Sequence, residues 1–111
     1  MTLKIKKLIY KYFHDFNAHN LNELSQNFSK NIHLNDWELN IKGISRVLKA
    51  NKNIFKKFPE IKVNIKELYI NKNIVFAVLL IRLNKKKFIN VVDVFTINEK
   101  KKISKIRDYL G

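Results

Sequence analysis

The hydrophobic pattern of the sequence changes its period near Pro59, the only proline of the chain. Before Pro59, apolar residues recur every three or four positions in three stretches, as in helices that bury one face. After Pro59, apolar residues alternate with polar ones or form short continuous runs, as in strands. A chain that places its helices before most of its strands favours an α+β domain, in which helices cover one face of a curved sheet.

Three helices are predicted before Pro59. The first covers residues 3–17, because its apolar residues have helical spacing: Ile5, Leu8, Ile9, Tyr12, Phe13 and Phe16. The second follows Asn20, which is suited to the N-cap position, with Glu23 as its capping-box partner. The third begins at Gly43 and ends before Pro59, because the residue before a proline disfavours the helical conformation.

Five strands are predicted. A short one at residues 31–37 separates the second and third helices. Four more, expected to be antiparallel, follow Pro59 at residues 61–70, 74–83, 88–97 and 102–110. The apolar alternation slips near Glu67, which predicts a bulge. With 111 residues, the chain is long enough for one domain and too short for two, so residues 1–111 are taken as a single domain.

The formal net charge of +14 invites a nucleic-acid interpretation. However, 20 of the basic residues are lysines and only 3 are arginines, and arginine is the better residue for bidentate phosphate recognition. The lysines are also spread along the chain, with short clusters at the predicted turns 85–87 and 100–102. We therefore expect a solvated basic surface with weak attraction to polyanions, and no specific nucleic-acid partner.

Several features disfavour other classes of protein. The chain has no cysteine, so disulfides, thiol catalysis and zinc–thiolate sites are excluded. The longest apolar run, 74–81, is too short to span a bilayer, and the first residues lack the apolar core of a signal peptide, so we expect a cytoplasmic location and no membrane partner. His14, His19 and His33 lack metal-ligand spacing and are expected at the surface or an edge, and Gly-rich phosphate motifs are absent.

Three polar residues occupy positions where the pattern calls for apolar ones. Asp93 lies inside the apolar run 91–95, so burial should raise the pKa of its carboxyl and let the neutral acid donate a hydrogen bond. Asp36 shares a predicted strand face with Ile32 and Leu34. Tyr12 lies on the buried stripe of the first helix, where its hydroxyl needs a partner.

Each of these residues also has a structural interpretation. Asp36 can be a turn or cap residue, Tyr12 a core tyrosine, and Asp93 a buried structural acid. Three polar groups that converge from three different elements nevertheless favour a site more than any one of them does alone.

The chain as a whole resembles a known family. Its element order and motifs are similar to those of the nuclear transport factor 2-like superfamily, in the branch of SnoaL-like proteins and ketosteroid isomerase. The resemblance runs end to end and rests on residues 12–13 through 20–21, 32–37, Gly43, 58–59, 91–95 and 103–109. It implies a cone-shaped, curved antiparallel sheet wrapped around the N-terminal helices.

The resemblance also implies roles for the three polar residues. The catalytic base of the isomerases falls on Asp36, and their two oxyanion-hole donors fall on Tyr12 and Asp93. Ketosteroid isomerase is the known case of a carboxylic acid kept neutral by its apolar site. The pocket is expected to hold a small apolar ligand, without a metal or other cofactor, and to be lined by Trp37, Phe16, Phe55, Phe58 and Phe95.

Two functions remain open. One is a cofactor-independent isomerase that moves a proton next to a carbonyl. The alternative is a non-catalytic ligand-binding or dimeric interaction module, which is favoured by the bulky Trp37 after Asp36 and by the lack of an additional tyrosine in the region of Asn53 and Phe55. Both faces of strand 88–97 are apolar, so we also expect a homodimer.

Overall fold

The computed structural model describes residues 2–111, which form three helices and one six-stranded sheet. The helices are α1 (Thr2–Asn17), α2 (Leu21–Asn27) and α3 (Ile44–Lys57). The strands are β1 (Phe28–Asn35), β2 (Asn40–Lys42), β3 (Lys62–Asn71), β4 (Ile74–Arg82), β5 (Phe88–Ile97) and β6 (Ile103–Leu110). None of the helices within residues 2–111 has the length and apolar character needed to cross a bilayer.

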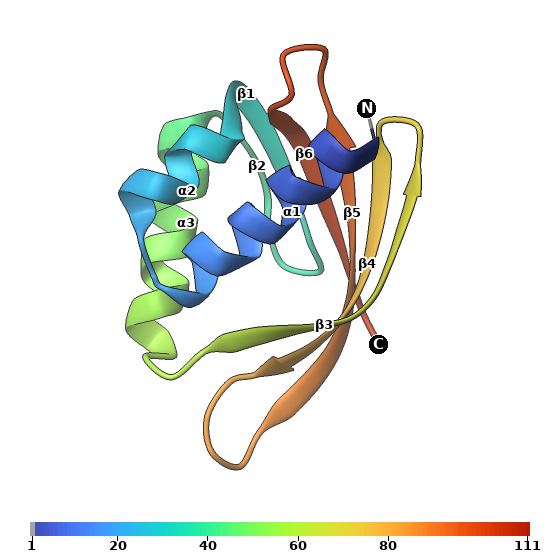
Figure 1. The fold of residues 1–111 in the computed structure, drawn as a ribbon. Helices are drawn as coiled ribbons and strands as arrows, with labels where there is room; N and C mark the ends of the chain where they lie inside the picture. The colour runs from blue at the N-terminus through green and yellow to red at the C-terminus, as the bar shows by residue number, and fades with distance from the viewer. Residues whose placement is uncertain (1) are drawn as a thin grey trace.

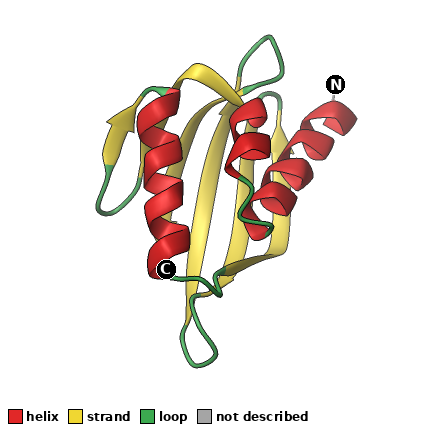
Figure 2. Cartoon of the chain, turned by 90° about the vertical axis from the view of Figure 1, so that its left-hand side faces the viewer, coloured by secondary structure: helices red, strands yellow, loops and turns green. Residues whose placement is uncertain are grey.

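The sheet curves around the helices, which all lie on one of its faces (Figures 1 and 2). Its strand order is β2-β1-β6-β5-β4-β3. The four long strands after Pro59 pair antiparallel, as predicted. The sheet as a whole is mixed, because β1 runs parallel to β6. The α+β, cone-like architecture is therefore confirmed, with one parallel pair in a sheet that was expected to be antiparallel.

Local signals in the sequence set the helix boundaries. The side chain of Asn20 accepts a hydrogen bond of 3.0 Å from the backbone N–H of Glu23, which caps α2 as predicted. Gly43 has φ of 95°, a conformation that favours glycine, and α3 begins at the next residue. The helix ends at Lys57, two residues before Pro59.

A bulge bends β3 toward α1. The register between β3 and β4 shifts between Ile65 and Glu67, where the sequence predicts it. Such a bulge increases local twist and bends the strand, and Figure 1 shows β3 sweeping past the C-terminal end of α1. Asn17, the last residue of α1, fixes this arrangement by accepting from the backbone N–H of Val63 and donating to its carbonyl oxygen.

The core lies between the helices and the inner face of the sheet. Its largest fully buried side chains include Phe95 and Leu79 from the sheet and Ile9 and Leu24 from the helices. Residues two apart on a strand share a face, so the buried side chain of Phe95 places Asp93 on the same inner face. The apolar stripe of α1 covers that face and brings Tyr12 toward it.

Candidate functional site

Three carboxyl groups lie in one row across neighbouring strands. Asp93 on β5 stands directly opposite Asp108 on β6, and residues opposite each other project from the same face of a sheet. β1 runs parallel to β6 with Asn35 opposite Arg107, so Asp36, the next residue, comes level with Asp108. The strand pairing therefore places Asp93 and Asp108 on the helix-covered face, and Asp36 follows the end of β1 close enough for its charge to act on both.

Burial dominates the electrostatics of this row. Only 6% of Asp93 is exposed. Burial raises the pKa of Asp93 well above its ordinary value, and the charge of Asp108, a hydrogen bond with Asp108 and the charge of Asp36 raise it further. Burial and the charge of Asp36 also raise the pKa of Asp108, although its hydrogen bond with Asp93 acts in the opposite direction. The buried Oδ1 of Asp108 has no hydrogen-bond partner within residues 2–111.

Tyr12 brings a phenol from α1 to the same region. It is 6% exposed, and its ring packs edge-on against Phe13 and Phe95 at centroid distances of 5.0 and 5.4 Å. Burial raises the pKa of Tyr12, and the charges of Asp93 and Asp108 raise it further, so the hydroxyl keeps its proton and can donate. No hydrogen bond within residues 2–111 engages this hydroxyl, in contrast to that of Tyr69, which bonds Glu67.

Asp36 lies outside the strand in which the sequence placed it. β1 ends at Asn35, and Asp36 opens the turn to β2. Its Oδ1 accepts hydrogen bonds of 2.7 and 2.6 Å from the backbone N–H groups of Glu38 and Leu39. This is the turn role that the sequence left open. Its charge nevertheless acts on both Asp93 and Asp108, so Asp36 remains part of the row.

Part of the predicted apolar lining gathers around Tyr12. The ring of Phe16 lies 6.3 Å from that of Tyr12 and 5.0 Å from that of Phe55, and Phe55 in turn stacks on His19. Phe95 also contacts Tyr12 and has no exposed surface, which makes it a core residue.

The other two predicted lining residues have no aromatic contact with this group within residues 2–111. Phe58 follows the end of α3 under the ammonium of Lys57, and Trp37 is 47% exposed in the turn after β1.

The predicted pocket is not among the hollows described on the molecule. One hollow lies between α2 and α3 and is lined by residues such as Leu21 and Lys52. Another lies beside the turn between β5 and β6 and is lined by residues such as Phe28 and Lys100. Neither is lined by Tyr12, Asp36 or Asp93, so the pocket between them remains a prediction.

The sequence-based search missed Asp108. The residue follows Ile106 by two positions and therefore shares its face, which was the available signal. Its position opposite Asp93 depends on the register of β6, and this register shifts between Thr96 and Ile97. Counting residues from the turn does not reveal such a shift.

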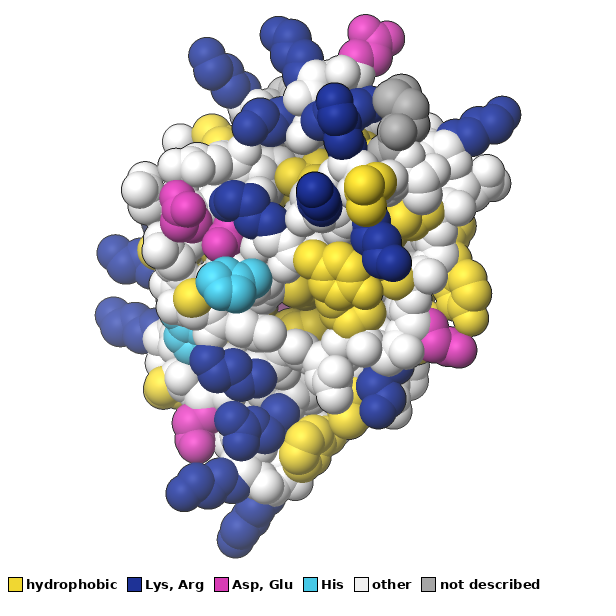
Figure 3. Space-filling view, viewed as in Figure 1, with side chains coloured by type: hydrophobic (Ala, Val, Ile, Leu, Met, Phe, Trp, Pro, Cys, Tyr) yellow, Lys and Arg dark blue, Asp and Glu magenta, His cyan; other side chains and the backbone are white. Residues whose placement is uncertain are grey.

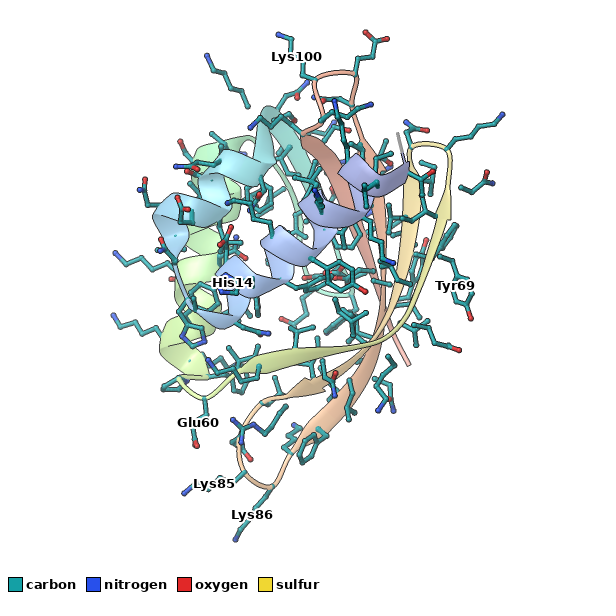
Figure 4. All side chains as sticks on the ribbon, viewed as in Figure 1. His14, Glu60, Tyr69, Lys85, Lys86 and Lys100 are labelled. Carbon is teal, nitrogen blue, oxygen red and sulfur yellow. The ribbon has the colours of Figure 1, made fainter. Side chains whose placement is uncertain are left out.

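The basic residues form no single patch. Lysines lie on α1 and α3, on β1, β2, β3 and β6 and in three turns. Figure 3 shows basic side chains at the top, left and bottom of one face, with apolar side chains at its centre and acidic ones among them. Two histidines lie at the surface, as expected: His14 is exposed on α1 (Figure 4), and His33 contacts Asn40. Within residues 2–111, no three His, Asp or Glu side chains are placed to hold a metal ion.

Comparison with known proteins identifies the family. The model of the SnoaL-like domain matches residues 9–106, which is most of the chain. No curated protein sequence matches the chain.

Solved structures match over almost the whole chain. A SnoaL-like protein of unknown function from Burkholderia thailandensis has a TM-score of 0.89 at 9% identity, with 100% of this chain and 97% of that one covered. SalBIII, an epoxide hydrolase/cyclase-like enzyme of pyran-ring formation in salinomycin, has a TM-score of 0.81 at 20% identity, with 99% of this chain and 92% of that one covered. A proposed ketosteroid isomerase from Kribbella flavida has a TM-score of 0.84 at 14% identity, with 97% of this chain and 78% of that one covered. At these identities the structures establish the fold alone.

Proposed function

The chain belongs to the SnoaL-like domain family, and from that premise we propose that it binds a small apolar ligand beside Tyr12, Asp36 and Asp93. We further propose that it moves a proton next to a carbonyl of this ligand, as a cofactor-independent isomerase. The observation that carries the proposal is the placement of Asp93. It is a buried acid on the inner sheet face, with a raised pKa and with the phenol of Tyr12 nearby.

Each residue has a defined task in this reaction. Asp36 takes the proton from the carbon next to the carbonyl and returns it to another carbon. Tyr12 and the neutral Asp93 donate hydrogen bonds to the oxygen of the dienolate that forms between these steps. The two backbone N–H groups that bind Oδ1 of Asp36 fix the orientation of its carboxyl group, so that Oδ2 is the oxygen that takes the proton.

The apolar rings around Tyr12 suit a hydrophobic ligand. Phe16 and Phe55 are both partly buried, and their rings contact each other next to Tyr12. A ligand that reaches Asp93 must displace some of these side chains, because Tyr12 and Asp93 have little exposed surface. Neighbouring folds have been associated with ketosteroid isomerase and with epoxide hydrolase/cyclase-like chemistry.

The alternative is a non-catalytic ligand-binding or dimeric module of the same fold. It is favoured by the close packing of Tyr12 against Phe13 and Phe95, which fills space that a substrate needs. In this alternative, Asp36 serves the turn between β1 and β2, and Asp93 and Tyr12 bind a ligand without turnover.

We also propose that the uncovered face of the sheet holds a second copy of the chain. Phe76 stands opposite Val94, and Val78 opposite Val92, so the centre of this face is apolar. Tyr69 lies beside Phe76, is 56% exposed and points away from the helices in Figure 4. Charged residues flank this apolar strip on both sides, because Glu67 on β3 stands opposite Val78 and Arg107 on β6 stands opposite Val94. In a chain with a net charge of +14, this uncharged strip on β4 and β5 favours a homodimer.

Turnover of a β,γ-unsaturated bicyclic ketone tests the catalytic proposal. Formation of the conjugated enone is followed by its ultraviolet absorbance, for the wild type and for Asp36→Asn. The amide introduced by this substitution keeps an oxygen for the turn but cannot take a proton, so turnover is expected to fall by about 100-fold or more. Glu38→Gln, which alters an exposed acid of the same turn, is the matched control. Equal turnover by Asp36→Asn and the wild type would falsify the role of Asp36.

A further inference from the structure

We propose that Asp108 is the positioning partner of Asp93, and that the two carboxyl groups share one proton across β5 and β6. Asp93 then presents a hydrogen-bond donor to a neutral ligand, while Asp108 holds the negative charge behind it. This inference rests on the proposed function, because it explains how that site keeps a donor at neutral pH. It begins from the direct pairing of the two residues in the register of the sheet.

Within residues 2–111, no Lys, Arg or His side chain forms an ion pair with the row. The ion pairs within residues 2–111 are made by Asp15 and Glu23 with Lys11, and by Asp15 with His14. Asp36, Asp93 and Asp108 are in none of them. Like charges that face each other across a sheet repel, and two buried carboxylates that share a site cannot both ionise readily. A single proton held between Asp93 and Asp108 removes this repulsion and provides the hydrogen bond that joins them.

Among the described residues, Asp108 is the group that faces Asp93 closely enough to share its proton. On the β4 side it faces Ala77, on the β6 side Asp108, and beyond β6 the turn contributes Asp36. From α1 the nearby ionisable group is Tyr12, which is itself a donor. Asp93 is more deeply buried than Asp108. Since burial penalises the charged form, the proton resides on Asp93 and the charge on Asp108.

The arrangement also defines the ligand class. A row that contains the charges of Asp36 and Asp108 repels anions, so carboxylates and phosphates are disfavoured. The ligand that fits is a neutral, largely apolar carbonyl compound whose oxygen accepts hydrogen bonds.

Carbonyl-detected ¹³C NMR of the ligand-free protein tests the shared proton without reference to any ligand. The carboxyl carbons of Asp36, Asp93 and Asp108 are followed against pH in the wild type, in Asp108→Asn and in the control Glu38→Gln. We expect the Asp93–Asp108 pair to titrate in two separated steps and to retain one proton at neutral pH. In Asp108→Asn the like charge is gone and an amide can donate to Asp93, so the midpoint of Asp93 shifts toward the ordinary carboxyl range. Glu38→Gln leaves it unchanged.

Two results would overturn the proposal. One is a wild-type spectrum in which Asp93 and Asp108 are both ionised at neutral pH, which needs no variant to be folded. The other is an Asp93 midpoint that is the same in Asp108→Asn and in the wild type. The shared proton and the proposed isomerase activity can fail independently. A protein that shows the shared proton but turns over no ketone supports the Asp93–Asp108 pair and refutes the isomerase.

Discussion

Replacement of Asp93 by asparagine is expected to stabilise the protein, and increasingly so as the pH rises. The side chain is 6% exposed, and burial, the charge and hydrogen bond of Asp108 and the charge of Asp36 all raise its pKa in the folded state. A group whose pKa is raised by folding contributes its full stability below the pKa of the unfolded chain, about 3.9. This contribution is lost as the pH rises through the folded-state pKa. Asparagine has nearly the same shape and does not ionise, so it avoids the loss.

The expected magnitude follows from linkage. Each unit by which folding raises the pKa of Asp93 costs the wild type about 1.4 kcal/mol of unfolding free energy. The full cost applies once the pH exceeds the pKa of Asp93 in both the unfolded and the folded state. For a domain of this size, 1 kcal/mol corresponds to about 4 °C in Tm. In alkaline buffer, the Tm of Asp93→Asn should therefore exceed that of the wild type by about 6 °C for each unit by which folding raises the pKa of Asp93. In acid the two Tm values should differ little.

Thermal unfolding followed by circular dichroism at about pH 4, 6 and 8 measures this difference. Glu38→Gln is the control, because it removes an exposed acid next to the same row. A difference in Tm between Asp93→Asn and the wild type that does not change with pH would refute the reasoning. If Asp93→Asn were less stable than the wild type, and increasingly so as the pH rises, the fold would stabilise the ionised carboxylate of Asp93. That result would contradict the raised pKa expected from its burial beside Asp108 and Asp36.

Three further predictions concern other parts of the molecule. Asp36→Ala removes two hydrogen bonds to backbone N–H groups and should cost about 1–2 kcal/mol in urea unfolding, whereas Asp36→Asn, which keeps the acceptor oxygen, should cost less than half of that. Asp15→Ala should cost about 2–3 kcal/mol, because it leaves the buried amide of Asn27 without its 2.9 Å partner, and unfolding experiments would contradict this if the cost were near zero. Phe76→Arg should convert the proposed dimer to monomer in analytical ultracentrifugation at micromolar concentration, while Leu3→Arg, on an exposed face of α1, should not; a monomeric wild type would refute the interface.

Much of the fold could be predicted because local signals agree with the tertiary structure. The stripe on α1, the cap at Asn20 and the bulge before Glu67 each depend on a few neighbouring residues. The strands after Pro59 are long enough for alternation to show their faces, and this is why the inner position of Asp93 could be predicted.

The remaining features depend on pairing between distant segments. β2 has three residues, which is too short for a pattern, and its pairing with β1 turns residues 36–39 into a hairpin turn. The sequence therefore placed Asp36 on a strand and offered the turn only as an alternative. The charge of Asp36 nevertheless acts on the buried Asp93. The parallel contact of β1 with β6, and with it the row that contains Asp108, is a property of the sheet that no single strand encodes.

Tyr12 and Asp93 are proposed to donate hydrogen bonds to the oxygen of a neutral ligand. A crystal structure of the protein with a bicyclic phenol, whose ring oxygen imitates the dienolate oxygen, tests it most directly. We expect this oxygen to lie within hydrogen-bond distance of the Tyr12 hydroxyl and the Asp93 carboxyl, with Phe16 and Phe55 displaced around the rings. A phenol bound only at the hollow between α2 and α3, or none bound at millimolar concentration, would contradict it.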